Sequence, residues 1–414
     1  NVPRDYWTQV IDIELPPIVR FERQGGGKEA IENAAKLLSK AKFPVILSGA
    51  GVVLGGAIDE CKKLAEKLDA PVCNGYQHND SFPGSHPLAV GPLGYNGSKA
   101  AMELISKADV VLALGTRLNP FSTLPGYGID YWPKKATIIQ VDMNPDRIGL
   151  TKKVSVGICG DAKQVAQQIL DKLSSDAGNT GREERKNLIH KTKSAWLQTL
   201  SGLDHEEDDP GTVWNKEARE RDKDRMSPRQ AWRAIQDALP QDAIISSDIG
   251  NNCAIGNAYP TFEKPRKYLA PGLFGPCGYG FPAILGAKIG CPDTPVVGFA
   301  GDGAFGISMN EMSSCAREEW PAITMVIFRN YQWGAEKRNS ILWFDDNFVG
   351  TELDPELSYA KVANACGLKG VTCKTMEETT KAIKQSCGDQ KKCITTFIEI
   401  ILNQELCEPF RRDA

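Results

Sequence analysis

The sequence predicts an α/β protein with two doubly wound parallel-sheet domains. Continuous apolar runs such as PVILS (residues 44–48) and VVLAL (residues 110–114) are typical of strands that are buried on both faces. Segments with apolar residues at helical spacing, such as KEAIENAAKLLSK (residues 28–40), separate these runs. Because alternating strands and helices form parallel sheets covered by helices, we expect each half of the chain to fold in this way.

Size, charge and cysteine content limit the classes of protein and partner. The chain has 414 residues, of which 41% are hydrophobic, so it can form two or more cores. Its net charge of -3 provides no basic field for nucleic acid or an anionic membrane, so we expect small-molecule and protein partners. No apolar run approaches the roughly 20 residues that span a bilayer. The 12 cysteines include no C-x-x-C pair, which favours reduced thiols in a cytoplasmic protein.

Residues 27–176 are expected to form the first of these domains. The glycine loop GAGVVLGG (residues 49–56) follows a strand, as in dinucleotide-binding motifs, but the next strand ends in PVCNG without an acidic residue. A bound flavin or nucleotide is therefore the weaker alternative for this domain. The expected strands are 44–51, 110–118 and 137–145, and the expected helices are 28–41, 58–68 and 161–173.

A charged segment separates this domain from the second one. Residues 177–226 are dense in charge, which predicts a solvated helix followed by an exposed linker. Residues 227–414 then form the second domain. Its expected strands are 243–248, 295–302, 323–330 and 396–402, and its expected helices are 227–239, 281–290, 308–319, 356–367 and 376–387.

Polar groups follow three of the strands expected in the second domain. These groups are Asp248, Asp302 and Asn330, and ligands of open parallel sheets bind beyond the carboxyl ends of the strands. Gly301 and Gly303 flank Asp302 and permit a close backbone approach. Hard oxygen donors with little charge suit Mg²⁺, which also binds water and phosphate oxygens.

A helix predicted after these residues would favour an anion at the same edge of the sheet. Ser308 and Glu311 have the capping-box spacing, so we expect a helix to begin there with its N-terminal dipole toward the crevice. An Asp in a G-D-G turn is most often only a turn residue. The Asn that follows the next strand strengthens the prediction of a magnesium-diphosphate site.

The segment 301–334 closely resembles the signature of the thiamine diphosphate enzymes. In that family the Asp, the Asn and a backbone carbonyl two residues later bind the metal that anchors the cofactor. The resemblance implies Asp302, Asn330 and Gln332 as metal ligands. The family commonly has two consecutive Asn residues, and we interpret Arg329, which precedes Asn330, as a minor departure.

Further segments extend this resemblance over nearly the entire chain. SSDIGNN (residues 246–252) is similar to the family's diphosphate-contacting segment, which implies Gly250 and Asn251. Within LFGPCGYG (residues 273–280), Cys277 has the position of the apolar residue that props the bent cofactor, although a purely core cysteine is an equal alternative. The resemblance also implies cofactor contacts by residues of the G-D-G-A turn, which are Gly301, Asp302, Gly303 and Ala304.

The region after Asn330 indicates a group within the acetolactate synthase-like branch of the family. Residues 333–354 resemble sulfoacetaldehyde acetyltransferases, whereas acetolactate synthases have Trp at the position of Asn339. This resemblance implies sulfite release from sulfoacetaldehyde and acetyl transfer to phosphate. Lys337 and Arg338 are candidate groups for the sulfonate or phosphate, and solvent-facing positions are an equal alternative. Acetolactate synthase, a related 2-oxo acid enzyme and a non-catalytic cofactor-binding subunit are the alternative functions.

The resemblance also implies a protein partner. In the family, a glutamate of an N-terminal pyrimidine-binding domain activates the cofactor, and the site forms between two subunits. Residues 1–26 resemble the end of such a domain, so we expect the catalytic Glu outside this sequence, on a longer chain or a partner. A homodimer or homotetramer is the expected assembly.

Overall fold

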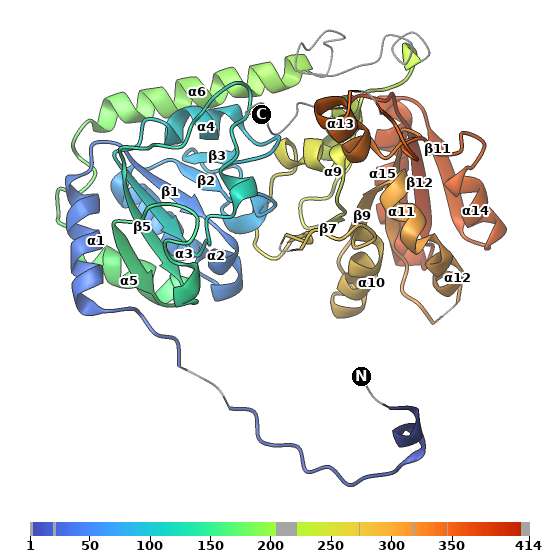
Figure 1. Cartoon of the computed structure of the whole chain (residues 1–414), viewed down its shortest axis with the longest axis horizontal. Helices are drawn as coiled ribbons and strands as arrows, with labels where there is room; N and C mark the ends of the chain where they lie inside the picture. Colours follow the sequence, from blue (N-terminus) through green and yellow to red (C-terminus); the bar gives the residue numbers. More distant parts are fainter. Residues whose placement is uncertain are drawn as a thin grey trace.

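The computed structural model describes residues 3–19, 22–203, 222–272, 274–317, 319–345 and 347–406. The described residues form two six-stranded sheets in which all strand pairs are parallel. Figure 1 shows the two sheets side by side with helices packed around each of them. The predicted fold class of two doubly wound α/β domains is confirmed.

The middle domain has the strand order β3-β2-β1-β4-β5-β6. The short strands β3 and β6 were not predicted, because runs of four residues carry little periodicity. Its strands are β1 (Pro44–Ser48), β2 (Val72–Asn74), β3 (Ala89–Pro92), β4 (Val110–Leu114), β5 (Thr137–Asp142) and β6 (Val156–Cys159), and its helices are α1 (Lys28–Lys40), α2 (Ala50–Gly55), α3 (Ile58–Leu68), α4 (Lys99–Ile105) and α5 (Ala162–Lys172).

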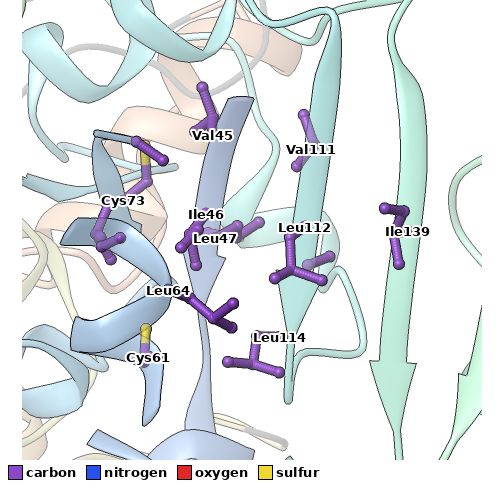
Figure 2. Packing of buried hydrophobic residues seen from close by; sticks show 14 of the residues in the cluster. Val45, Ile46, Leu47, Cys61, Leu64, Cys73, Val111, Leu112, Leu114 and Ile139 are labelled. Atoms are coloured by element: carbon purple, nitrogen blue, oxygen red, sulfur yellow. The ribbon is translucent and has the colours of Figure 1, made fainter. Parts of the chain in front are cut away.

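The central strands of this domain are buried on both faces. All residues of β1 and β4 are buried, as expected for continuous apolar strands beneath helices. Figure 2 shows Leu64 and Cys61 of α3 beside β1, so at least one cysteine packs as an apolar core residue. Burial raises the pKa of the Cys61 thiol to about 12. None of the cysteines among the described residues forms a disulfide.

The charged segment forms α6 (Arg182–Leu203), and this helix is less solvated than predicted. Arg185, Ile189, Trp196 and Leu200 are buried at helical spacing. Ile189 joins the core of the middle domain, whereas Trp196 and Leu200 join the core cluster that includes residues of the second domain. The helix therefore has a buried face that was not predicted, because charged residues dominate its sequence. The next segment, residues 204–221, was expected as a linker and lies outside the described residues.

The C-terminal domain has the strand order β11-β12-β10-β9-β7-β8. Strands β7, β9 and β10, whose ends carry the predicted site, are adjacent in this order. Its strands are β7 (Ile244–Ser247), β8 (Tyr268–Leu269), β9 (Val296–Gly301), β10 (Thr324–Arg329), β11 (Lys369–Cys373) and β12 (Thr396–Ile401), and its helices are α8 (Pro228–Ala238), α9 (Asn251–Ile255), α10 (Gly280–Gly290), α11 (Asp302–Ser308), α12 (Met312–Cys315), α13 (Gly334–Trp343), α14 (Tyr359–Ala365) and α15 (Met376–Asp389).

The region expected as a helix from residue 308 contains the 3-10 turn η6 (Met309–Glu311) followed by the short helix α12, and a separate helix precedes them. Helix α11 starts at Asp302, and Ser308 is its last residue. The predicted capping box is wrong, because the Ser308 hydroxyl donates to the carbonyl of Gly278 and the Glu311 carboxylate accepts from Ser314. Sequence spacing alone cannot distinguish such a tertiary bond from a cap.

Polar contacts hold the two domains together beside the site. Asn79 of the middle domain donates from its amide nitrogen to the carbonyls of Asn257 and Pro260, both at 2.9 Å. The Asp80 carboxylate accepts from the backbone N–H groups of Lys267 and Tyr268. These buried hydrogen bonds fix how the strand ends of the two sheets face each other.

Residues before the middle domain have little regular structure. They contain one 3-10 turn, η1 (Arg4–Thr8), and the described residues up to residue 24 are exposed. Figure 1 shows this segment extending away from both sheets. No helix in the described part of the chain is long and apolar enough to cross a lipid bilayer.

Candidate functional site

The strand ends of the C-terminal domain bring the predicted polar residues to one edge. Strand β9 pairs with β7 on one side and with β10 on the other, with Phe299 opposite Ser247 and Gly301 opposite Phe328. Asp302 therefore follows β9 beside the Arg329–Asn330 end of β10. The parallel sheet produces this proximity, as the sequence predicted.

Asp248 organises the loop that carries Cys277. Its carboxylate accepts hydrogen bonds from the backbone N–H groups of Ile249, Gly278 and Gly280 at 2.8, 3.0 and 2.7 Å. Cys277 itself is partly exposed, and burial and the negative charge of Asp248 raise the pKa of its thiol. Asp248 is thus a structural anchor that fixes this loop next to β7.

Asp302 is buried and strongly hydrogen-bonded. Its side chain is 1% exposed and accepts from the backbone N–H groups of Gly303 at 3.0 Å and Tyr331 at 2.7 Å. Arg329 Nη1 donates to the second carboxylate oxygen at 2.9 Å. Burial raises the pKa of the Asp302 carboxyl to about 6, because it outweighs the opposite effect of Arg329.

Arg329 holds this carboxylate from the interior of the domain. Its side chain is fully buried and also donates to the carbonyls of Asp354 and Leu357, the latter at 3.0 Å. Its guanidinium lies over the Tyr331 ring at 4.2 Å from the ring centroid. The interpretation of Arg329 as a minor departure is incomplete, because this residue is an ion-pair partner of a predicted metal ligand.

Among the described residues, buried amide atoms at the predicted site residues of this edge have no hydrogen-bond partner. They are Asn330 Oδ1, Gln332 Oε1 and Asn251 Nδ2. An unsatisfied buried polar group costs about 1–3 kcal/mol, so such groups at one site indicate a ligand that is bound in the functional state. A Cβ atom on Gly334 would lie 3.2 Å from Asn251 Nδ2 and 3.5 Å from the side-chain nitrogen of Gln332, so both amides flank this glycine.

Glycine is favoured at the positions of this site for different reasons. No heavy atom lies within 4 Å of the Cβ position of Gly301, and the same holds for Gly250, whose φ of 128° favours glycine. The Cβ position of Gly303 lies 2.8 Å from the ring of Trp333. Gly301 and Gly250 therefore leave open space, whereas Gly303 accommodates the Trp333 ring. Ala304, which follows Gly303, is buried.

A cavity of about 540 Å³ lies between the two domains. Of the predicted residues, Gly250, Asn251 and Arg338 line it, and Asn339 lines it as well. Asp302, Asn330 and Gln332 are not among its lining residues. The structure thus brings the predicted diphosphate contacts to a cavity of the size of small-molecule sites, with the predicted metal ligands in the adjacent interior.

The two candidate substrate cations have different surroundings. The Lys337 ammonium group contacts the carboxylate of Glu352 and the side-chain oxygen of Gln404, and Lys337 does not line the cavity. The Arg338 guanidinium lies 5.1 Å from the ring centroid of Tyr95, a middle-domain residue. Only Arg338 is therefore positioned at the interdomain cavity.

Two arginines of the middle domain were missed by the sequence analysis. Arg117, which follows β4, and Arg147, which follows β5, both line the cavity. Their segments LGTRLNP and MNPDRIG (residues 114–120 and 143–149) were assigned only to the middle domain. The position of each arginine just after a predicted strand was the signal that could have identified it as a site residue. Only the tertiary structure shows that these strand ends face the C-terminal domain.

Family models match both domains. The model for the central domain of thiamine pyrophosphate enzymes matches residues 31–169, and the model for their C-terminal TPP binding domain matches residues 248–400. The chain is 77% identical to a probable sulfoacetaldehyde acetyltransferase of Rhizobium meliloti (strain 1021), over the whole chain and 70% of that protein. The chain belongs to the thiamine pyrophosphate enzyme family.

Other relatives differ widely in similarity. A sulfoacetaldehyde acetyltransferase of Roseovarius nubinhibens is 75% identical over the whole chain and 69% of its own length. A probable acetolactate synthase large subunit of Methanocaldococcus jannaschii is 29% identical, over 93% of the chain and 64% of its own length. The predicted resemblance to thiamine diphosphate enzymes, another name for this family, is confirmed.

The residues present fit a thiamine diphosphate site with a hard metal ion. Residues 248–400, matched as a TPP-binding domain, contain all the predicted cofactor contacts. The described residues contain no group of three or more His, Cys, Asp or Glu side chains that would hold a metal. A metal here would instead require amide and carbonyl oxygens with a single carboxylate, and the unpartnered Asn330 Oδ1 beside Asp302 supplies such an oxygen.

Proposed function

We propose that the chain provides the middle and cofactor-binding domains of a sulfoacetaldehyde acetyltransferase in the cytoplasm. The observation that carries this proposal is the identity of 67–77% along the whole chain to three relatives with that name. Identity to the probable acetolactate synthase of M. jannaschii is only 29%. This difference supports the first function over acetolactate synthesis.

The strand ends of the C-terminal domain would hold Mg²⁺ and the diphosphate group. Asp302, Asn330 Oδ1 and the Gln332 carbonyl would bind the metal, and Asn251 Nδ2 would donate to a diphosphate oxygen. Their burial and the unpartnered amide atoms support this assignment. Gly301 leaves open space at the turn, so that a diphosphate can approach the backbone.

The chain would balance the charge of this site from its interior. Arg329 orients Asp302 and compensates its buried charge, which keeps the carboxylate aligned for a cation. Cys277 lies in the loop that Asp248 anchors and would contact the apolar middle of the cofactor. Thiamine diphosphate supplies, when bound, a carbon nucleophile that adds to a carbonyl carbon and accepts its electron pair.

The overall reaction would be sulfoacetaldehyde plus phosphate giving acetyl phosphate plus sulfite. The C–S bond breaks, and its electron pair leaves with sulfite. The aldehyde carbon loses its proton, forms a bond to a phosphate oxygen and becomes the acyl carbon of acetyl phosphate. The methylene carbon gains a proton and becomes the methyl group. Asn339, at the position of the Trp of acetolactate synthases, lines the cavity, and its smaller polar side chain would leave room for a charged substrate.

The proposed enzyme would also need a pyrimidine-binding domain. The matched domains hold the diphosphate end, and the family resemblance implies a glutamate from a further domain at the other end of the cofactor. We propose that this domain belongs to a longer chain or to a partner subunit in a homodimer or homotetramer. The coverage of 69–70% of the sulfoacetaldehyde acetyltransferase relatives described above supports this proposal.

Product analysis would test the function. The chain would be incubated with thiamine diphosphate, Mg²⁺, phosphate and either sulfoacetaldehyde or pyruvate, alone and fused to the N-terminal remainder of the R. meliloti relative. We expect sulfite and acetyl phosphate from sulfoacetaldehyde in the fused protein and no turnover by the chain alone. Carbon dioxide release from pyruvate without sulfite release would instead support a 2-oxo acid enzyme, and no turnover in the fused protein would support a non-catalytic subunit.

A further inference from the structure

The interdomain cavity carries cationic groups from both domains. Arg117 and Arg147 line it from the middle domain and Arg338 from the C-terminal domain. The acidic residue that lines it with them, Asp248, already accepts three backbone N–H bonds. The cavity therefore presents a net positive charge to a ligand.

The two middle-domain arginines make few polar contacts within the described part of the chain. Among the described residues, no ion pair involves Arg117 or Arg147, and the Arg147 side chain donates no hydrogen bond. Arg117 uses one N–H group for the carbonyl of Gly272 at 3.0 Å, across the domain boundary. Burial and the charge of Arg147 lower the pKa of Arg117, and together they outweigh the opposite effect of the Asp142 carboxylate.

The remaining walls of the cavity fit a small organic or inorganic anion. Tyr95, Phe121 and Leu150 provide apolar surface around the arginines, and of these Tyr95 is buried whereas Phe121 and Leu150 are exposed. Gly250 and Asn251 line the same cavity, so an anion bound there lies beside the diphosphate-contacting segment.

We propose that Arg117 and Arg147 of the middle domain form an oxyanion site at the domain interface that takes the phosphate or sulfonate group of a substrate. This inference rests on the proposed function, and it makes the middle domain a direct participant in substrate recognition. Guanidinium groups suit both anions, because their planar N–H groups match pairs of phosphate or sulfonate oxygens. Arg338 completes the site from the C-terminal domain.

Anion binding to the full chain tests this site without any turnover. Inorganic phosphate and ethanesulfonate would be titrated into the chain at constant ionic strength, with binding followed by calorimetry. We expect Arg147→Gln to weaken binding of both anions about tenfold, the loss of one charge-assisted contact. Arg317→Gln, which removes the same charge from an exposed position, is the matched control and should leave both affinities unchanged.

Several outcomes would overturn the site. They are absence of anion binding by the wild-type chain, equal losses in Arg147→Gln and Arg317→Gln, and unchanged affinity in both Arg147→Gln and Arg117→Gln. A thermal melt of each variant separates a lost site from a lost fold. Within the described residues the Arg147 side chain donates no hydrogen bond, so its replacement removes none that would hold the domain together.

A parallel titration with ADP identifies the source of the anion. If ADP binds much more tightly than phosphate and Arg147→Gln weakens its binding, the site takes the phosphate of a nucleotide. If ADP binds more weakly than phosphate, the site takes the free anions. Failure of the site is distinguishable from failure of the proposed function. Sulfite release by a fused protein that binds no anion at these arginines rejects only the site, and anion binding without sulfite release rejects only the function.

Discussion

The two sheets of this protein have the same number of parallel strands but differ in how their strand-end polar groups are satisfied. At the ends of β1 and β2, Ser48 and Asn74 both hydrogen-bond to Ser81, at 3.0 and 2.9 Å. Near the ends of β10 and β7, Asn330 Oδ1 and Asn251 Nδ2 are buried and have no partner within the described part of the chain. Both sets of residues occupy the edge at which parallel sheets bind ligands.

This difference shows that fold alone does not locate a binding site. Ser48 and Asn74 are satisfied by hydrogen bonds within the middle domain, whereas Asn330 Oδ1 and Asn251 Nδ2 are unpaired groups whose desolvation a ligand would offset. The contrast holds for these residues and not for the whole edge, because Gln77 Oε1 and Asn79 Oδ1, which follow β2, are also buried without a partner among the described residues. The clearest tests of the comparison make the same substitution at matched residues of the two domains.

Removal of the buried carboxylate should have the largest effect. We expect Asp302→Asn to reduce Mg²⁺-dependent thiamine diphosphate binding by roughly 100-fold or more, because it removes the charged metal ligand. Asp142→Asn, at the end of β5, is the matched middle-domain control and should leave the cofactor affinity unchanged. Calorimetric titration at up to millimolar cofactor measures both, and undiminished affinity in Asp302→Asn would remove this residue from the metal site.

Substitutions of two buried arginines would distinguish an effect on stability from an effect on ligand binding. Arg329 pairs with Asp302, whereas Arg185 of the middle domain donates only to backbone carbonyls. We expect Arg329→Met and Arg185→Met each to lower the free energy of unfolding by about 3 kcal/mol, because each leaves buried polar partners unsatisfied. Only Arg329→Met should also weaken cofactor binding. Urea denaturation and cofactor titration would measure these effects, and equal cofactor affinity in the two variants would refute a role of Arg329 in aligning Asp302.

Truncation of the unpaired amide should have an intermediate effect. Asn330→Ala should weaken cofactor binding about tenfold, less than Asp302→Asn, because a neutral amide interacts less strongly with a cation. Asn74→Ala removes a satisfied hydrogen bond, so it should cost about 1 kcal/mol of stability without any change in affinity. The comparison between the two edges fails if Asn330→Ala lowers the melting temperature but not the affinity.

The smallest effect is expected at Cys277. Cys277→Leu should change turnover of the complete enzyme by no more than a few-fold, because Leu is closer to the apolar residue that the family resemblance implies. Cys277→Asp should impair turnover through the cost of placing a charge against the cofactor. Cys291→Asp, at an exposed cysteine, is the control. Full activity of Cys277→Asp would exclude this residue from the site.

The fold class and the edge that carries the site were predictable from local pattern. Buried strands such as β1 and β10 are continuous apolar runs, and helices such as α1 have apolar residues at helical spacing, so neighbours in sequence suffice to identify them. Asp302 and Asn330 follow such strands, and parallel pairing places them together. The family resemblance then implied their ligand.

The contacts that tune the site depended on tertiary structure. Helix α11 begins at Asp302 and ends at Ser308, whose hydroxyl donates to the carbonyl of Gly278 in a distant loop, and no capping pattern reveals this bond. In the sequence, Arg329 is a single departure from the family motif. In the structure its fully buried side chain forms an ion pair with Asp302. Arg117 and Gly272 are far apart in sequence and meet only where the domains face each other. Periodicity determines which face of an element is buried, but which charges share a cavity depends on how separately folded layers pack.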